Sequence, residues 1–114
     1  MNIQFSETQE MLRTSARDFL AENAPASLAR QMRDDPTGYP QALWSALADL
    51  GWTGLCLPEE HGGSGMSLLD FCLLQEELGR ACAPTPFIPT MAAAMAIVGF
   101  GSDAQKSDLP RVAR

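Results

Sequence analysis

The sequence predicts an all-α fold, an orthogonal or up-and-down bundle of five to six helices, and its 114 residues are the length of one domain. Apolar residues recur at the three- and four-residue spacing of amphipathic helices. Capping residues and prolines mark the expected helix ends. No stretch shows the sustained alternation of a strand, and residues 52–57 are at most a short extended piece.

The first two helices are predicted from their ends. Ser6 is an N-cap, and Gln9 stands at the position that completes a capping box. The helix should end near Asn23, because Pro25 disfavours helical geometry in the residue before it. Pro25 then starts a short second helix that continues to Met32. The apolar stripe of the first helix consists of Leu12, Ala16, Phe19 and Leu20.

A turn and a third helix follow. Residues 34–38 hold the Asp, Pro and Gly types that favour turns. Pro40 is expected to be the first residue of the third helix, with Trp44 beside its apolar face, and Gly51 is a left-handed terminator. The residues expected to line one face are Leu43, Leu47 and Leu50.

The connection over residues 50–65 is long for a small helical domain. It contains five glycines, one proline, two adjacent glutamates and the only histidine, His61. A connection of this length is unusual unless it binds something or packs against something.

The fourth helix is capped by Ser67, and Asp70 places a negative charge in its first turn. The prolines at 84, 86 and 89 predict an extended passage after it. The expected core stripe is Phe71, Leu74 and Leu78, and the expected polar side is Gln75, Glu76, Glu77 and Arg80.

The last third of the chain predicts two more helices. Residues 90–98 form a helix that is apolar nearly all the way round, so it should be central or should face a partner or domain outside this chain. Ser102 and Gln105 form a capping box for a final helix, which Pro110 interrupts or kinks.

Composition excludes several functions. The net charge is −6 and the only lysine is Lys106, so no basic stripe serves nucleic acid or a membrane surface. Residues 91–101 are apolar but too short to span a bilayer. Cys56, Cys72 and Cys82 match no zinc or redox spacing. An odd cysteine count without a signal peptide predicts reduced thiols and a cytoplasmic location.

No catalytic or metal-binding constellation emerges from the residues. His61-Gly62-Gly63 resembles an oxyanion loop, but a nucleophile elbow and a second histidine are missing, so a hydrolase is rejected. A phosphate cradle is disfavoured, because no strand and no Lys-Ser/Thr pair accompany the glycines. Adjacent glutamates stand at 59–60 and 76–77. Glu76 and Glu77 lie on a helix and cannot converge on one metal, so a solvated helix face with one structural hydrogen bond is favoured.

Three blocks in this order and spacing closely resemble the acyl-CoA dehydrogenase family: Leu-Gly-Trp-Thr-Gly at 50–54, Pro-Glu-Glu-His-Gly-Gly-Ser-Gly at 58–65 and Glu-Glu-Leu-Gly at 76–79. The resemblance extends from residues 5–19 to residues 101–110 and so covers essentially the whole chain. It implies that residues 1–114 are the N-terminal helical domain of a three-domain flavoenzyme. The middle β-domain and the C-terminal helical bundle would then lie outside this chain.

The resemblance implies an activity and a set of partners. Such enzymes oxidise an acyl-CoA thioester to the trans-2-enoyl-CoA, use FAD, pass electrons to an electron-transfer flavoprotein and form homo- or hetero-tetramers. Most FAD contacts and the catalytic base would belong to the later domains, so no catalytic, cofactor-binding or metal residue is assigned here. This domain would wall the acyl cavity through residues 82–90, with Pro86, Phe87 and Thr90 facing the acyl chain.

Three prolines in that segment depart from many straight-chain members of the family. Similar segments occur in bacterial members that act on branched or bulky acyl groups, including sterol side chains. The chain also ends at residues 111–114 without a capping glycine or polar tail, which favours truncation within an element. We therefore expect an N-terminal domain that is inactive in isolation. The alternative is a stand-alone or non-catalytic helical interaction module derived from that domain.

Overall fold

The computed structural model describes residues 3–114, and these contain six α-helices, three 3-10 turns and no strand. The predicted all-α class is therefore confirmed. The helices are α1 (Glu7–Asn23), α2 (Ala26–Met32), α3 (Gln41–Asp49), α4 (Leu68–Arg80), α5 (Phe87–Phe100) and α6 (Asp103–Lys106). The 3-10 turns are η1 (Trp52–Gly54), η2 (Glu59–His61) and η3 (Leu109–Arg111).

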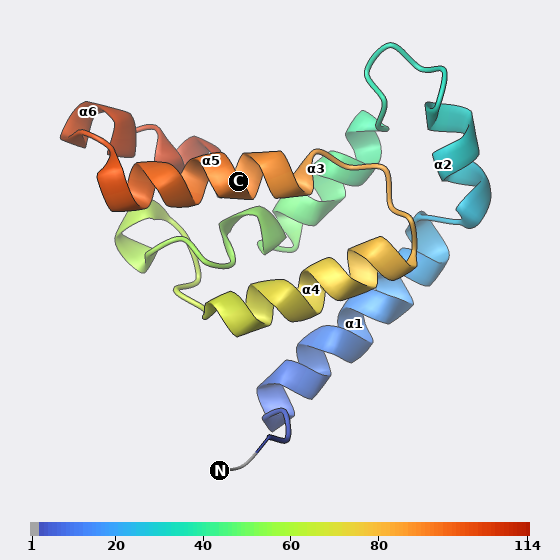
Figure 1. Ribbon diagram of the computed structural model, residues 1–114, viewed down its shortest axis with the longest axis horizontal. Helices are drawn as coiled ribbons and strands as arrows, with labels where there is room; N and C mark the ends of the chain where they lie inside the picture. The colour runs from blue at the N-terminus through green and yellow to red at the C-terminus, as the bar shows by residue number, and fades with distance from the viewer. Residues whose placement is uncertain (1–2) are drawn as a thin grey trace.

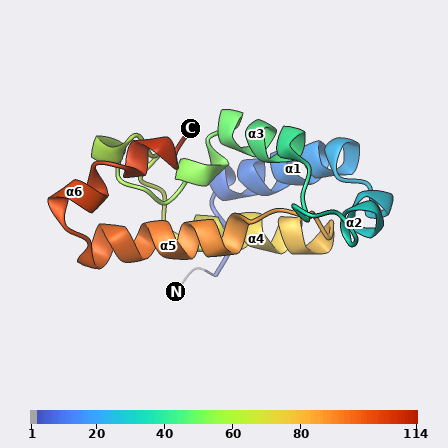
Figure 2. The same cartoon turned by 90° about the horizontal axis from the view of Figure 1, so that it is seen from above.

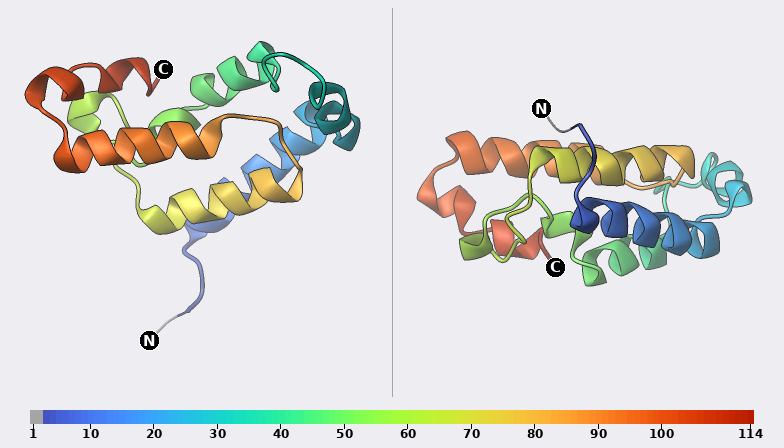
Figure 3. Two further views of the ribbon diagram at one scale, coloured as in Figure 1. Left: turned by 45° about the horizontal axis from the view of Figure 1, so that its top comes forward. Right: turned by 90° about the horizontal axis from the view of Figure 1, so that it is seen from below.

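The helices form a slab of two layers. Its extents are 41 × 41 × 20 Å, and the short axis is about two helix diameters. Figures 2 and 3 show α4 and α5 in one layer and α1 and α3 in the other. Helices α1 and α4 pack against each other along the slab (Figure 1). In so thin a body the core lies only between the layers, so each long helix keeps one face outside.

The core is one cluster of buried apolar side chains from both layers. Trp52 contributes from η1, with its ring 5.4 Å from that of Phe19 in an edge-to-face arrangement. The largest fully buried apolar side chains are Leu20, Leu47, Leu57, Leu74, Phe87, Met91 and Leu109. The prediction that Leu50 lies on the apolar face of α3 is wrong. It is 48% exposed, because it follows the last helical turn as the C-cap.

The predicted helix caps are confirmed at both ends of the chain. The boxes at Ser6–Gln9 and Ser102–Gln105 both form. Pro25 and Pro40 precede their helices as N-caps instead of opening them, because their ψ angles of 152° and 126° are extended. The final helix α6 ends at Lys106, and Pro110 lies in the separate turn η3.

Asp70 and Ser67 form a third capping box at the start of α4. The Asp70 Oδ2 atom accepts hydrogen bonds from the Ser67 amide at 2.7 Å and the Ser67 hydroxyl at 2.6 Å. The bond from the Ser67 hydroxyl is the main cause that lowers the pKa of the Asp70 carboxyl, against the opposing effect of burial. This end of α4 therefore depends on an ionised Asp70.

We expect Ser67→Ala to lower the free energy of unfolding by about 1 kcal/mol, because it removes the cap. A depressed carboxyl pKa gives stability that is full above the unfolded pKa of about 3.9 and is lost as pH falls through the folded pKa. The Asp70→Asn variant should therefore show a flatter loss of stability below pH 4. Urea unfolding at several acidic pH values measures this, and an unchanged acid limb would contradict it.

Candidate functional site

The glycine-rich connection between α3 and α4 folds back on itself. It contains the turns η1 and η2, so the extended piece expected at residues 52–57 is wrong. Four successive amides donate hydrogen bonds within the segment at 2.9–3.1 Å. The donors are Gly62, Gly63, Ser64 and Gly65, and the acceptors are the carbonyls of Glu59, Pro58, Gly54 and Leu57 in that order. Because these donors are already paired, the glycines cradle neither a phosphate nor an oxyanion.

Close packing explains two of these glycines. A Cβ atom at Gly63 would lie 2.1 Å from the carbonyl oxygen of Leu57, far inside any allowed contact. At Gly54 it would lie 3.0 Å from the Cβ of Ala113, near the end of the chain. The segment thus packs its backbone against itself and against the C-terminal residues. Its role in this domain is to connect helices at close range.

His61 lies in η2 with its side chain 20% exposed. Its Nε2 atom is 3.5 Å from the exposed carboxylate of Glu60. Within residues 3–114 no three His, Cys, Asp or Glu side chains converge as a metal-binding group. In the part of the chain that the structure describes, His61 therefore belongs to no metal-ligand set.

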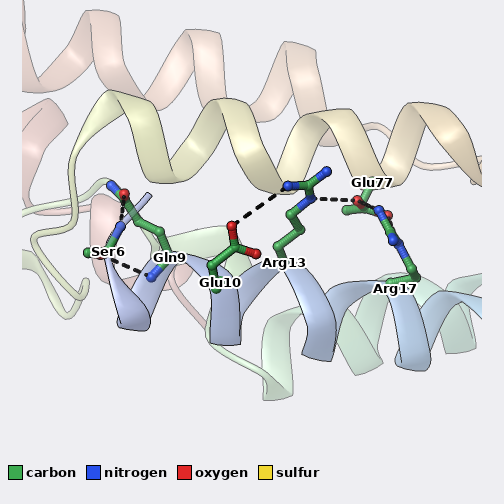
Figure 4. A network of polar contacts seen from close by, with 6 residues as sticks. All are labelled: Ser6, Gln9, Glu10, Arg13, Arg17 and Glu77. Carbon is green, nitrogen blue, oxygen red and sulfur yellow. Dashed lines mark hydrogen bonds and ion pairs between the residues drawn. The ribbon is translucent and has the colours of Figure 1, made fainter. Parts of the chain in front are cut away.

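Glu77 is the main correction to the predicted polar face of α4. It is buried, with 2% of its side chain exposed. Arg17 on α1 donates two hydrogen bonds to its carboxylate, from Nη2 to Oε1 at 2.6 Å and from Nε to Oε2 at 3.1 Å. Arg13 approaches at 3.5 Å and Arg80 at 3.6 Å. Figure 4 shows Arg13 and Arg17 reaching from α1 to Glu77.

The physical cause of this burial is the helix period. Position 77 follows the core residue Leu74 by three positions and so faces α1. The hydrogen bonds from Arg17 are the main cause that lowers the pKa of the Glu77 carboxyl, and burial opposes them. A usable signal was present in the sequence. Arg13 and Arg17 are four residues apart on α1, so they lie on the same helix face and can both reach one carboxylate.

The predicted wall residues do not all lie together. Pro86 and Thr90 line the same hollow on one flank of α5. Phe87 is 1% exposed and faces the core, where its ring stacks on that of Phe71 at 5.7 Å. Helix α5 also begins earlier than predicted, at Phe87. Pro89 is accommodated in its first turn, where the backbone N–H has no helical partner to lose.

The outward side of α5 is an exposed apolar surface. Its exposed large side chains are Ile88 at 56%, Met95 at 36% and Phe100 at 94%. Alanines at 92, 93 and 96 are exposed between them, and no charged residue occurs from Phe87 to Phe100. An exposed apolar surface of this kind marks an interaction site. None of the helices within residues 3–114 is long and apolar enough to cross a membrane.

The glycine segment and the hollow beside Glu77 do not fit a flavin pyrophosphate. A flavin nucleotide needs free backbone donors or unengaged cations for its pyrophosphate. The glycine-segment amides are paired internally. A hollow of about 380 Å³ at the ends of α1 and α4 contains Arg17 and Arg80, but Glu77 lies between them. We therefore assign no cofactor contact to this chain.

The family model and a curated relative both indicate the same protein family for this chain. The family model described as the acyl-CoA dehydrogenase N-terminal domain matches residues 6–114. The acyl-CoA dehydrogenase IpdE2 of Mycolicibacterium smegmatis is 35% identical over 97 residues, which are 84% of this chain and 31% of that protein.

Two solved structures match the fold. A variant of the Tcur3481-Tcur3483 steroid ACAD superimposes with a TM-score of 0.87 and 36% identity, over 94% of this chain and 30% of that one. The ChsE4-ChsE5 complex from Mycobacterium tuberculosis superimposes with a TM-score of 0.81 and 32% identity, over 99% of this chain and 29% of that one. The chain thus spans about a third of the length of the proteins it matches.

Proposed function

Because this chain belongs to the acyl-CoA dehydrogenase family, as its N-terminal domain, we propose that it walls the acyl cavity of an enzyme that oxidises acyl-CoA thioesters. The observation that carries the proposal is the exposed apolar side of α5. In this proposal the flavin and the catalytic base belong to the family's other two domains. The contribution of this domain is to exclude water and to contact the acyl chain.

The wall is proposed to have two parts. The outward side of α5, with Ile88 and Met95, offers apolar contact to an acyl chain, and Pro86 and Thr90 flank it. Phe87 holds α5 in place through its buried ring. It also lines a hollow of about 240 Å³ together with Ile88 and Pro89.

The proposed substrate is a CoA thioester with a branched or bulky acyl group. Two features support this choice: the three prolines before and within α5, and the similarity to a steroid ACAD. The proposed partners are an electron-transfer flavoprotein and further subunits in a homo- or hetero-tetramer. The similarity to a complex of two named chains supports the hetero-oligomer. The three free thiols support a cytoplasmic location.

A substitution in the wall tests this function in the protein that joins this domain to the other two. Ile88→Ala should enlarge the cavity and shift kcat/KM toward the bulkier of two acyl-CoA substrates by about tenfold or more, since a single methylene group in an apolar pocket is worth at least about tenfold. Met11→Ala on α1 is the matched control, because Met11 is also exposed and lines a hollow formed by α1 residues alone. An unchanged substrate ratio in Ile88→Ala would contradict the wall assignment.

The alternative function is a non-catalytic helical module or subunit derived from the same domain. The exposed α5 side would then bind a protein partner. The sequence after Arg114 separates the two possibilities. A β-rich segment followed by a helical bundle supports the enzyme, and a stop codon supports the module.

A further inference from the structure

Residues 102–113, which contain α6 and η3, form a strap across one end of the slab. Figure 2 shows this strap running from α6, beyond the end of α5, back toward the C-terminus in the other layer. The backbone hydrogen bonds that its amides donate all end within the strap, at carbonyls of residues 102–109. The ion pair between Arg111 and Asp108 is also internal. Among the described residues, the strap is therefore joined to the two layers by packing and not by hydrogen bonds.

Two buried apolar side chains hold the strap closed. Leu109 is 1% exposed and Ala113 is 6% exposed, and both belong to the core. Ala113 lies against the glycine segment, since a Cβ atom at Gly54 would lie 3.0 Å from its Cβ and 3.2 Å from its Cα. A Cβ atom at Gly62 would lie 3.8 Å from the same methyl group. The strap thus fits against two glycines through apolar contact, which has no preferred direction.

The link between α5 and the strap is suited to act as a hinge. Helix α5 ends at Phe100, and Gly101 and Ser102 follow with extended ψ angles of 156° and 164°. A Cβ atom at Gly101 would lie 2.6 Å from the carbonyl oxygen of Ile97, so no other residue fits there without a shift. Glycine has the widest range of backbone conformations, and hinges are often a few residues at the end of an element. Rotation at Gly101 can therefore move the strap without disturbing α5.

We propose that the strap opens as one unit about Gly101 while α1–α5 stay folded, and that it closes when Leu109 and Ala113 return to the core. A local opening of this kind requires less free energy than global unfolding, because it exposes only part of the core. It uncovers Gly54, Gly62 and the adjoining edge of the core. Once released, the strap should lose its own turns, since helices as short as α6 are not stable alone. The proposal concerns the fold and does not rest on the proposed function.

Native-state hydrogen exchange of the 114-residue chain, followed by NMR at low urea concentrations, tests this opening. The amides of Val112 and Ala113 both donate to the Leu109 carbonyl and report on the strap, whereas the Leu78 amide reports on α4. We expect protection of the two strap amides to be at least about tenfold lower than that of Leu78 and nearly independent of urea. Equal protection with equal urea dependence would overturn the proposal, and so would strap amides with no protection at all.

Gly79→Ala separates strap opening from global unfolding. It strengthens α4, which stays folded when the strap opens, and a Cβ atom there meets nothing within 4 Å. Exchange at Leu78 should therefore slow about threefold, while exchange at Val112 and Ala113 stays unchanged. Equal slowing at all three amides would show that the strap opens only when the whole domain unfolds.

Gly54→Ala tests the contact that holds the strap closed. The added methyl group crowds Ala113 only in the closed strap, so exchange of the Val112 and Ala113 amides should rise about fivefold or more. Exchange of these two amides at the wild-type rate would contradict the part assigned to Ala113.

Discussion

Glu77→Gln is expected to lower the free energy of unfolding by about 2–3 kcal/mol. Loss of one partner of a buried ion pair costs about 3–5 kcal/mol, and the half-exposed Arg17 reduces that figure. The carboxylate accepts both hydrogen bonds from Arg17, whereas an amide turns an NH₂ group toward the guanidinium. Three arginines would then face no buried negative charge. Because the network joins α1 to α4, the effect should reach the whole fold.

Two comparisons make the Glu77 prediction specific. Glu76→Gln changes the neighbouring exposed glutamate and should stay within about 0.5 kcal/mol of wild type. The folded pKa of Glu77 is depressed, so its stabilisation is full above the unfolded pKa of about 4.3 and is lost as pH falls through the folded value. Glu77→Gln should therefore flatten the acid limb. Urea unfolding followed by circular dichroism measures both effects, and equal losses in the two variants would contradict the prediction.

Gly63→Ala is expected to destabilise the fold by about 3 kcal/mol or more. The added Cβ would meet backbone atoms of Leu57, at 2.1 Å from its oxygen and 2.5 Å from its carbonyl carbon. Overpacking typically costs about 1–3 kcal/mol, and rigid backbone has less room to relax than a side chain. Relief of the clash would also disturb the Gly63 and Gly65 hydrogen bonds that close the segment.

Gly79→Ala is the matched control for this glycine. A Cβ at Gly79 would meet no atom within 4 Å, and the residue lies inside α4. Alanine should therefore stabilise the helix there by about 0.5–1 kcal/mol. In thermal unfolding we expect Gly63→Ala to lower the melting temperature and Gly79→Ala to raise it. A neutral Gly63→Ala would show that the connection is looser than the structure indicates.

The sequence predicted best what depends on near neighbours. The caps at Ser6, Ser67 and Ser102 and the left-handed end at Gly51 are each determined within a few residues. The resemblance carried by the glycine segment named the family, which residues 6–114 confirm.

The clearest failure involves a partner far along the chain. The prediction that Glu77 lies on a solvated face is wrong. Its burial depends on Arg17, which is sixty residues away in the sequence and leaves no signal near position 77. The turns at residues 52–61 form through contacts among their own amides and carbonyls, which apolar periodicity does not report. Periodicity also fails on α5. A helix apolar on every side gives no pattern that separates Phe87, which is buried, from Ile88, which is exposed.

In the proposed function this domain walls a site whose chemistry lies in the family's other two domains. The direct test is to purify the 114-residue chain, equilibrate it with FAD and measure bound flavin together with acyl-CoA-dependent reduction of a dye acceptor. We predict no stoichiometric flavin and no turnover. A chain that holds one flavin per molecule, or that reduces the dye with acyl-CoA, would contradict the claim.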